Sequence, residues 1–155
     1  MILRQIQAHH YRVLAVRDPV EGESVLAVLN DAKRFHPRLF EQITAALREH
    51  APTYGPPFAE DRTGVARAKR LYGGIAEFIA QNRDMSRGAR AQQSRDEKRL
   101  GLRVFFFEYG RDIICTNACY KTHPTPEGAL DACFRVRASY LNYLAGGKVP
   151  IIEGD

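Results

Sequence analysis

The chain has 155 residues, 45% of them hydrophobic and 26% charged, which is the balance of an ordinary globular protein with a core of its own. No apolar run approaches the roughly 20 residues that a membrane helix needs, and the first residues lack the apolar core of a signal peptide. We therefore expect a cytoplasmic protein without membrane contact.

The net charge of +5 is unevenly distributed along the chain. Between Arg83 and Arg103, seven cations stand against three acids, which gives this stretch alone a charge of +4. A polyanionic partner, with nucleic acid as the first candidate, is the functional interpretation of such a segment. A solvated loop that only keeps the protein soluble is the alternative.

The first half of the chain predicts one strand, two helices and an irregular stretch, at residues 9–16, 24–33, 37–50 and 58–69. Within the strand, Val13 and Ala15 alternate with Leu14 and Val16, so the two pairs are expected on opposite faces. Pro37 suits the first turn of the second helix, and the prolines that follow residue 50 cannot continue it.

The second half predicts a glycine turn, a strand, a mobile basic segment, a hairpin and a helix, at residues 73–74, 75–80, 81–101, 102–120 and 126–145. Thr125 is the expected cap of that last helix, and Gly146 its end. The element order predicts a single α+β domain over residues 1–155. Its small antiparallel sheet would have two N-terminal helices and a C-terminal helix packed over one side.

The ends of the predicted hairpin carry the most informative residues. Arg103 enters the first strand and Lys121 leaves the second, so antiparallel pairing brings both cations to the same end. Arginine suits bidentate contact with phosphate and lysine suits a point charge, so this end of the hairpin is a candidate phosphate site. Both residues could instead be ordinary surface cations at strand ends.

Three cysteines, Cys115, Cys119 and Cys133, form an odd set without a closely spaced pair. Buried free thiols are the simplest interpretation. Cys115 and Cys119 lie four apart on a predicted strand and would share a face. A zinc site that adds His123 lacks the paired ligand spacing of structural sites, so we expect neither a metal nor another cofactor.

An ordered set of short motifs resembles the RelE/HigB superfamily of bacterial toxins, and its phage-derived HigB-like branch in particular. The set spans about residues 11–144 and consists of KRLYGGIAEF, LRVFFFEYGRDIICTNACYKTHPTP and LDACFRVRASYL. The matching positions are Leu71, Gly73, Gly74, Ile75, Glu77, Arg103, Val104, Lys121, Thr122, Thr125, Pro126, Arg135 or Arg137, and Tyr140. Relative to a typical member, the basic segment at about 83–100 is an insertion.

The resemblance implies a RelE-like fold and the toxin of a type II toxin–antitoxin system. Such a toxin is a metal-independent endoribonuclease, an mRNA interferase, that cleaves messenger RNA on the ribosome. A helix-turn-helix antitoxin would silence it. RNA cleavage without a metal needs a base at the 2′-hydroxyl, an acid for the leaving 5′-oxygen, and cations for the charged phosphorane.

Nine residues are candidates for these tasks. Arg103 and Lys121 would stabilise the phosphate charge, and His123 is the acid–base candidate because its ordinary pKa is about 6.5. Tyr140 would complete the catalytic set from the last helix. The residues expected to bind RNA are Arg95, Lys98, Arg99, Tyr120 and Arg137, with Tyr120 stacking on a base.

Two departures from the family pattern favour an alternative. Glu77-Phe78-Ile79 stands where the family often has Glu-Leu-Arg, and Tyr120-Lys121 stands in place of a double lysine. A non-catalytic module that binds RNA or an antitoxin on the same fold would tolerate both changes. An interaction domain without any nucleic-acid role is the third hypothesis.

Overall fold

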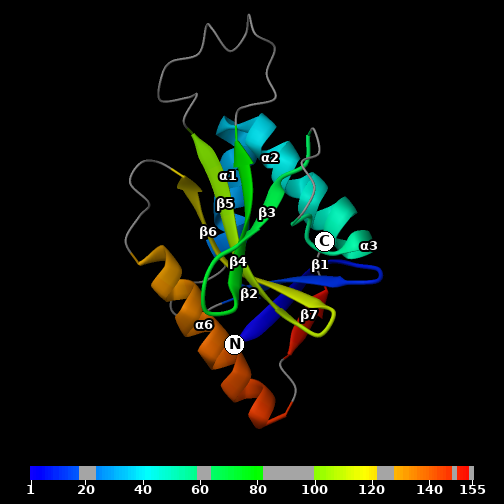
Figure 1. Ribbon diagram of the computed structural model, residues 1–155, viewed down its shortest axis with the longest axis vertical. Helices are drawn as coiled ribbons and strands as arrows, with labels where there is room; N and C mark the ends of the chain where they lie inside the picture. Colours follow the sequence, from blue (N-terminus) through cyan, green and yellow to red (C-terminus); the bar gives the residue numbers. More distant parts are fainter. Residues whose placement is uncertain (18–23, 59–63, 82–99, 122–127, 148–149, 154–155) are drawn as a thin grey trace, which may run out of the picture.

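The computed structural model describes residues 1–17, 24–58, 64–81, 100–121, 128–147 and 150–153. A seven-stranded sheet in the order β3-β4-β5-β6-β2-β1-β7 forms its centre (Figure 1). The strands are β1 (Ile2–Ala8), β2 (Arg12–Arg17), β3 (Arg67–Arg70), β4 (Ile75–Gln81), β5 (Gly101–Tyr109), β6 (Asp112–Lys121) and β7 (Ile151–Glu153). The helical segments are α1 (Ser24–Phe35), α2 (Pro37–Thr44), the π-helix η1 (Ala45–His50), α3 (Ala51–Tyr54) and α6 (Ala129–Ala145).

The sheet is mostly antiparallel, with two parallel pairs, β2 with β6 and β1 with β7. The chain can return from β2 to a parallel neighbour because helices and three further strands intervene. The α+β class, with two N-terminal helices and a C-terminal helix packed on the sheet, is confirmed. None of the helices in the described ranges combines the length and apolar character that a membrane span requires.

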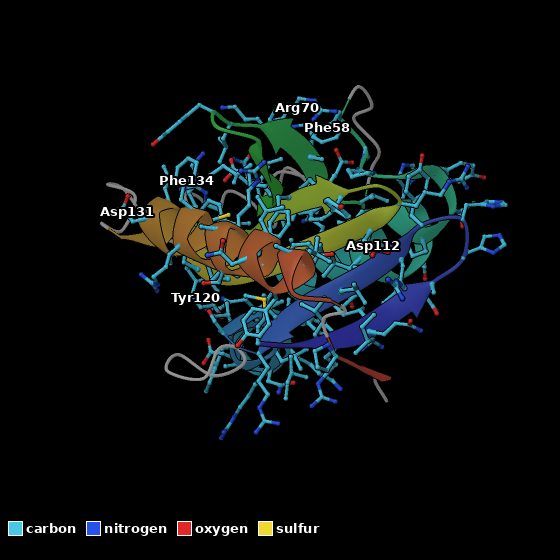
Figure 2. All side chains as sticks on the ribbon, turned by 90° about the horizontal axis from the view of Figure 1, so that it is seen from below. Phe58, Arg70, Asp112, Tyr120, Asp131 and Phe134 are labelled. Carbon is cyan, nitrogen blue, oxygen red and sulfur yellow. The ribbon has the colours of Figure 1, made fainter. Side chains whose placement is uncertain are left out.

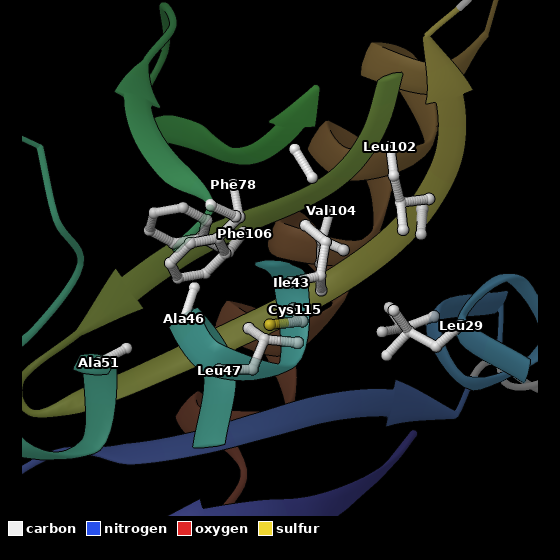
Figure 3. Close-up of a cluster of buried hydrophobic side chains, with 14 of the residues drawn as sticks. Leu29, Ile43, Ala46, Leu47, Ala51, Phe78, Leu102, Val104, Phe106 and Cys115 are labelled. Carbon is white, nitrogen blue, oxygen red and sulfur yellow. The ribbon is translucent and has the colours of Figure 1, made fainter. Parts of the chain in front are cut away.

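The helices cover both faces of the sheet, whereas the sequence predicted one covered side. One core lies between the sheet and the α1–α2–η1 layer, and a second core lies between the sheet and α6. The apolar run at residues 105–107 shows why. Phe106 packs into the first core and stacks on Phe78 at 4.4 Å (Figure 3). Phe105 and Phe107 belong to the second core. A strand buried on both faces reads as a continuous apolar run.

Strand β2 confirms the predicted alternation, since Val13 and Ala15 lie in the first core and Leu14 and Val16 in the second. The predicted strand over 9–16 began too early, because residues 9–11 form the turn between β1 and β2. Strands β1, β3 and β7 were not predicted. β3 is a four-residue edge strand of sequence RAKR, and β7 has three residues held by pairing to β1, so neither has a local period to detect.

Two helix ends differ from expectation. The second helical segment does not stop at His50 but passes through the π-helix η1 into α3 and ends at Gly55, whose φ of 81° suits glycine. The last helix ends at Gly146 as predicted, and it begins at Ala129. Its expected cap, Thr125, lies outside the described residues.

A β-bulge in β6 reverses one prediction about the cysteines. Phe105 pairs with Asn117 and Phe106 pairs with Cys115, so Thr116 is an extra residue on β6. The extra residue shifts the alternation, and Cys115 lies in the first core whereas Cys119 packs against the second. The two thiols therefore lie on opposite faces. All three cysteines are free, with Cys115 and Cys133 buried.

Candidate functional site

The open end of the β5–β6 hairpin carries two basic residues on one face of the sheet. Arg103 pairs with Cys119, and two positions further along the same strands Lys121 pairs with Gly101. Because side chains alternate along a strand, Arg103, Cys119 and Lys121 share the face on which α6 packs. The prediction that the hairpin brings Arg103 and Lys121 to the same end is confirmed.

Arg103 is a buried, paired guanidinium rather than an exposed cation. Its Nε donates a 2.5 Å hydrogen bond to Oε2 of Glu77 on β4, and the two side chains are only 8% and 4% exposed. Ile79 is the residue directly opposite Arg103, so Glu77 reaches the guanidinium diagonally from the neighbouring strand. The charge of Arg103 is balanced within the sheet, which leaves Lys121 as the outer basic group of the pair.

Sequence reasoning did not assign a site role to Glu77, although the residue belongs to the motif that carries the resemblance. A signal was present in the strand pattern. Ile75 of β4 packs in the second core, and by strand alternation Glu77 and Ile79 lie on the same side of the sheet, so an acid occupies a position where an apolar residue is expected. A buried acid in a strand requires a partner, and the neighbouring strand offers Arg103.

Cys119 lies beside this ion pair. Burial raises the pKa of its thiol, the nearby positive charge of Arg103 lowers it, and the carboxylate of Glu77 raises it again. The net shift is upward, so the sulfur is held as a neutral thiol at neutral pH. Cys119 therefore packs beside the ion pair as a neutral thiol and does not supply a nucleophilic thiolate.

Tyr140 lies at the opposite end of the hairpin, which separates it from Arg103 and Lys121. Its ring makes edge contacts with Phe107 at 5.3 Å and with Tyr109 at 5.8 Å, and it is 3% exposed. Tyr109 stands six residues from Arg103, or about 20 Å along a strand. Burial, followed by the negative charge of Asp112, raises the pKa of the Tyr140 hydroxyl. The expected catalytic role of Tyr140 at the cation pair does not fit this placement.

Arg137 also lies away from the cation pair. A Cβ atom at Gly74 would stand 3.2 Å from Nη2 of Arg137, so the guanidinium rests against the β3–β4 turn. That turn precedes Ile75, which pairs with Phe107 near the closed end of the hairpin. Arg137 therefore contacts the turn at the closed end of the hairpin, whereas Lys121 lies at the open end.

Tyr120 projects from the other face of the sheet. Its hydroxyl donates a 2.5 Å hydrogen bond to Asp31 of α1, and its ring meets His36 edge-on at 5.3 Å. Burial and the Asp31 carboxylate raise the pKa of the hydroxyl. Figure 2 labels Tyr120 and Asp112, which lie near the two ends of β6. Tyr120 and Lys121 point to opposite faces of the sheet, so the two do not form one site, and the stacking of Tyr120 on a base stays a prediction.

Four candidates, namely His123, Arg95, Lys98 and Arg99, lie outside the described residues. Strand pairing places the described residues that flank the basic segment. Gln81 pairs with Gly101, and Gly101 pairs with Lys121 on its other side. The side chain of Gln42 on α2 holds Gln81 in place. Its Nε2 donates a hydrogen bond to the Gln81 carbonyl at 2.8 Å, and its Oε1 accepts one from the Gln81 N–H at 3.2 Å.

Comparisons with known protein families, with curated proteins and with solved structures find no match to this chain. The chemistry of the site is therefore argued from its own residues. Lys121 offers a positive charge at the sheet end, and the Glu77–Arg103 pair offers a fixed, oriented dipole behind it. Within the described ranges, no three His, Cys, Asp or Glu side chains gather as a metal site would need.

Proposed function

We propose that this protein is an endoribonuclease toxin that cleaves messenger RNA on the ribosome in the cytoplasm and is silenced by a helix-turn-helix antitoxin. The ordered motifs that resemble the RelE/HigB superfamily support the proposal. An α+β fold with two N-terminal helices and a C-terminal helix on the sheet is consistent with it.

One observation carries the proposal: positive charge converges on one end of the sheet. Lys121 and Arg103 stand there on the face of α6, and both ends of the basic segment are attached there through Gln81 and Gly101. Residues 83–99 carry a charge of +3 and Lys121 adds one more, whereas the charge of Arg103 is balanced by Glu77. A polyanion that approaches this end would meet Lys121 first, because Arg103 is 6% exposed.

The proposed cleavage is a transfer of the phosphate from the 5′-oxygen to the 2′-oxygen of the RNA. The 2′-oxygen of the ribose attacks phosphorus, a base takes its proton, and the bond to the 5′-oxygen breaks as an acid protonates that oxygen. The products are a 2′,3′-cyclic phosphate and a 5′-hydroxyl. Lys121 would stabilise the charge that develops on the phosphorane, and His123 is the acid–base candidate. The Glu77–Arg103 pair would keep the local field fixed during the step.

The pairing of Arg103 with Glu77 favours a second candidate, a non-catalytic module that binds RNA or an antitoxin. A guanidinium that is already bound to a carboxylate contributes less attraction to a phosphate than an exposed one. Such a module would bind RNA with an affinity that falls steeply with salt, and would leave the RNA intact.

The test compares Lys121→Ala with Lys33→Ala under controlled expression in a bacterium. Lys33 is the matched control, because it is an exposed lysine on α1, which packs on the opposite face of the sheet from Lys121. We expect growth arrest and new messenger RNA 5′ ends with the wild type and with Lys33→Ala. Both effects should be lost with Lys121→Ala, while purified Lys121→Ala unfolds at the wild-type temperature.

Normal growth and intact messages with the folded wild-type protein would reject the endonuclease. Salt-dependent binding of RNA in that case would leave the non-catalytic module, and no binding at any salt concentration would leave the interaction domain. Cleavage that persists in Lys121→Ala would remove this residue from the site.

A further inference from the structure

A separate pocket lies on the opposite face of the sheet from Lys121, where β1, α1, α2 and η1 meet. Its volume is about 360 Å³. Leu29 and Leu47, both buried, belong to its lining, and the ring of Phe40 contributes an apolar wall. This size is within the range of small-molecule sites, which are concave and mostly apolar with a few polar groups.

Among the residues that the structure describes, the charged side chains that line the pocket are all basic. They are Arg4 of β1, Lys33 of α1 and Arg48 of η1. The Nζ atom of Lys33 stands 5.9 Å from the centre of the Phe40 ring, which places a cation at the margin of the apolar wall. Glu41 and Glu49 line an adjoining hollow together with Lys33 and Arg48.

Two backbone irregularities shape the pocket. In β1, Gln5 pairs with Leu14 and Gln7 with Val13, so Ile6 is an extra residue and belongs to the pocket lining. In the helical layer, the wider π-helix η1 supplies Leu47 and Arg48. Bulges and π-helical turns are over-represented at functional sites, where they redirect side chains. Both irregularities here contribute residues to the same pocket.

We propose that this pocket binds a small amphiphilic anion, a carboxylate on an apolar chain or ring. The apolar body would lie on Leu29, Leu47 and Phe40, and the head group would be bound by Lys33 and Arg48, with Arg4 at the β1 side. An apolar wall bordered by three cations disfavours a neutral hydrophobe and a bare inorganic anion alike, since each satisfies only half of the lining. The site is independent of the proposed RNA cleavage, because it uses none of the same residues and lies on the other face.

Calorimetric titration of the full chain with decanoate, below the concentration at which decanoate forms micelles, tests the proposal. We expect saturable binding of one decanoate per chain. Decanol and inorganic phosphate should each bind at least about tenfold more weakly, because each lacks one of the two contacts. The double variant Lys33→Ala/Arg48→Ala should also bind decanoate more weakly, by about tenfold or more.

The matched control is Arg34→Ala/Arg38→Ala. It removes the same charge from exposed positions of α1 and α2, outside the pocket lining, and should bind decanoate as the wild type does. Lys121→Ala should bind decanoate unchanged, which separates this site from the proposed RNA site. The proposal is overturned by non-saturable decanoate binding, by equal losses in the two double variants, or by decanol binding as tightly as decanoate. Displacement of decanoate by an RNA oligonucleotide at low salt would also overturn it.

Discussion

At the scale of single residues, the Glu77–Arg103 pair has the largest consequence for how the site is tested. Removing two charges from water costs several kcal/mol per ion, and the short hydrogen bond between them offsets much of that cost. A buried pair of this kind adds little net stability. Breaking it is different, because the remaining charge then has no partner in the low-dielectric interior.

We therefore predict that Arg103→Ala lowers the free energy of unfolding by about 3–5 kcal/mol, because Glu77 stays buried without its partner. The double variant Glu77→Leu/Arg103→Leu should be much closer to the wild type, since two apolar side chains replace the pair. Urea denaturation measures both. An Arg103→Ala loss below about 1 kcal/mol would contradict the pairing. Loss of activity in Arg103→Ala alone would not distinguish chemistry from folding, which is why Lys121→Ala is the cleaner test.

At the scale of elements, the β3–β4 turn and the β6 bulge hold α6 in place from two sides. Thr116, the extra residue of the bulge, donates a 2.6 Å hydrogen bond to Oδ1 of Asn117, whose Nδ2 donates to the Ala129 carbonyl in the first turn of α6. On the other side, the ring of Phe134 covers Gly73. These contacts hold α6 over the closed half of the hairpin. Its first residue, Ala129, contacts Asn117, and Lys121 lies four residues further along β6, toward the open end.

The turn contact predicts a difference between two glycine substitutions. Gly73 and Gly110 have φ values of 67° and 60°, so alanine is strained at both. A Cβ at Gly73 would stand 2.5 Å from the Phe134 ring, whereas nothing lies within 4 Å at Gly110. We expect Gly110→Ala to lower the free energy of unfolding by about 1–2 kcal/mol. Gly73→Ala should lower it by about 1–3 kcal/mol more, because α6 must also shift to make room for the new Cβ. Thermal unfolding measures both, and equal losses would show that the Phe134 contact is unimportant.

At the scale of the whole molecule, the sheet separates two cores, and buried thiols stand in or beside both of them. Burial raises the pKa of Cys115, Cys119 and Cys133 in the folded protein. The unfolded chain loses these protons near the ordinary pKa of about 8.5, before the folded protein does. The contribution of the protonated, buried thiols to the free energy of unfolding is therefore fully present below about pH 8.5, and it is lost as the pH rises above that value.

We predict that the free energy of unfolding falls between about pH 8.5 and pH 10, by about 1.4 kcal/mol per pH unit for the fully buried Cys115 alone. The free energy of unfolding of Cys115→Ala should fall less steeply with pH, by that amount. The cavity left by the substitution lowers its stability at every pH. Urea denaturation under reducing conditions at several pH values gives both slopes. Identical slopes for the wild type and Cys115→Ala would contradict the assignment.

The sequence by itself determined the local elements and the end of the hairpin at which Arg103 and Lys121 meet. Alternation in β2, the turn at Gly110 and the helix end at Gly146 depend on residues close together in the chain, so their periods and turn residues reveal them. Only the tertiary structure decided that Glu77 neutralises Arg103, that Tyr120 lies on the opposite face from Lys121 and Tyr140 at the opposite end of the hairpin, and that β7 joins β1. The reason is that register between distant strands, a single extra residue at Thr116, and the face that each helix covers are set by long-range packing, which leaves no periodic signal in the chain.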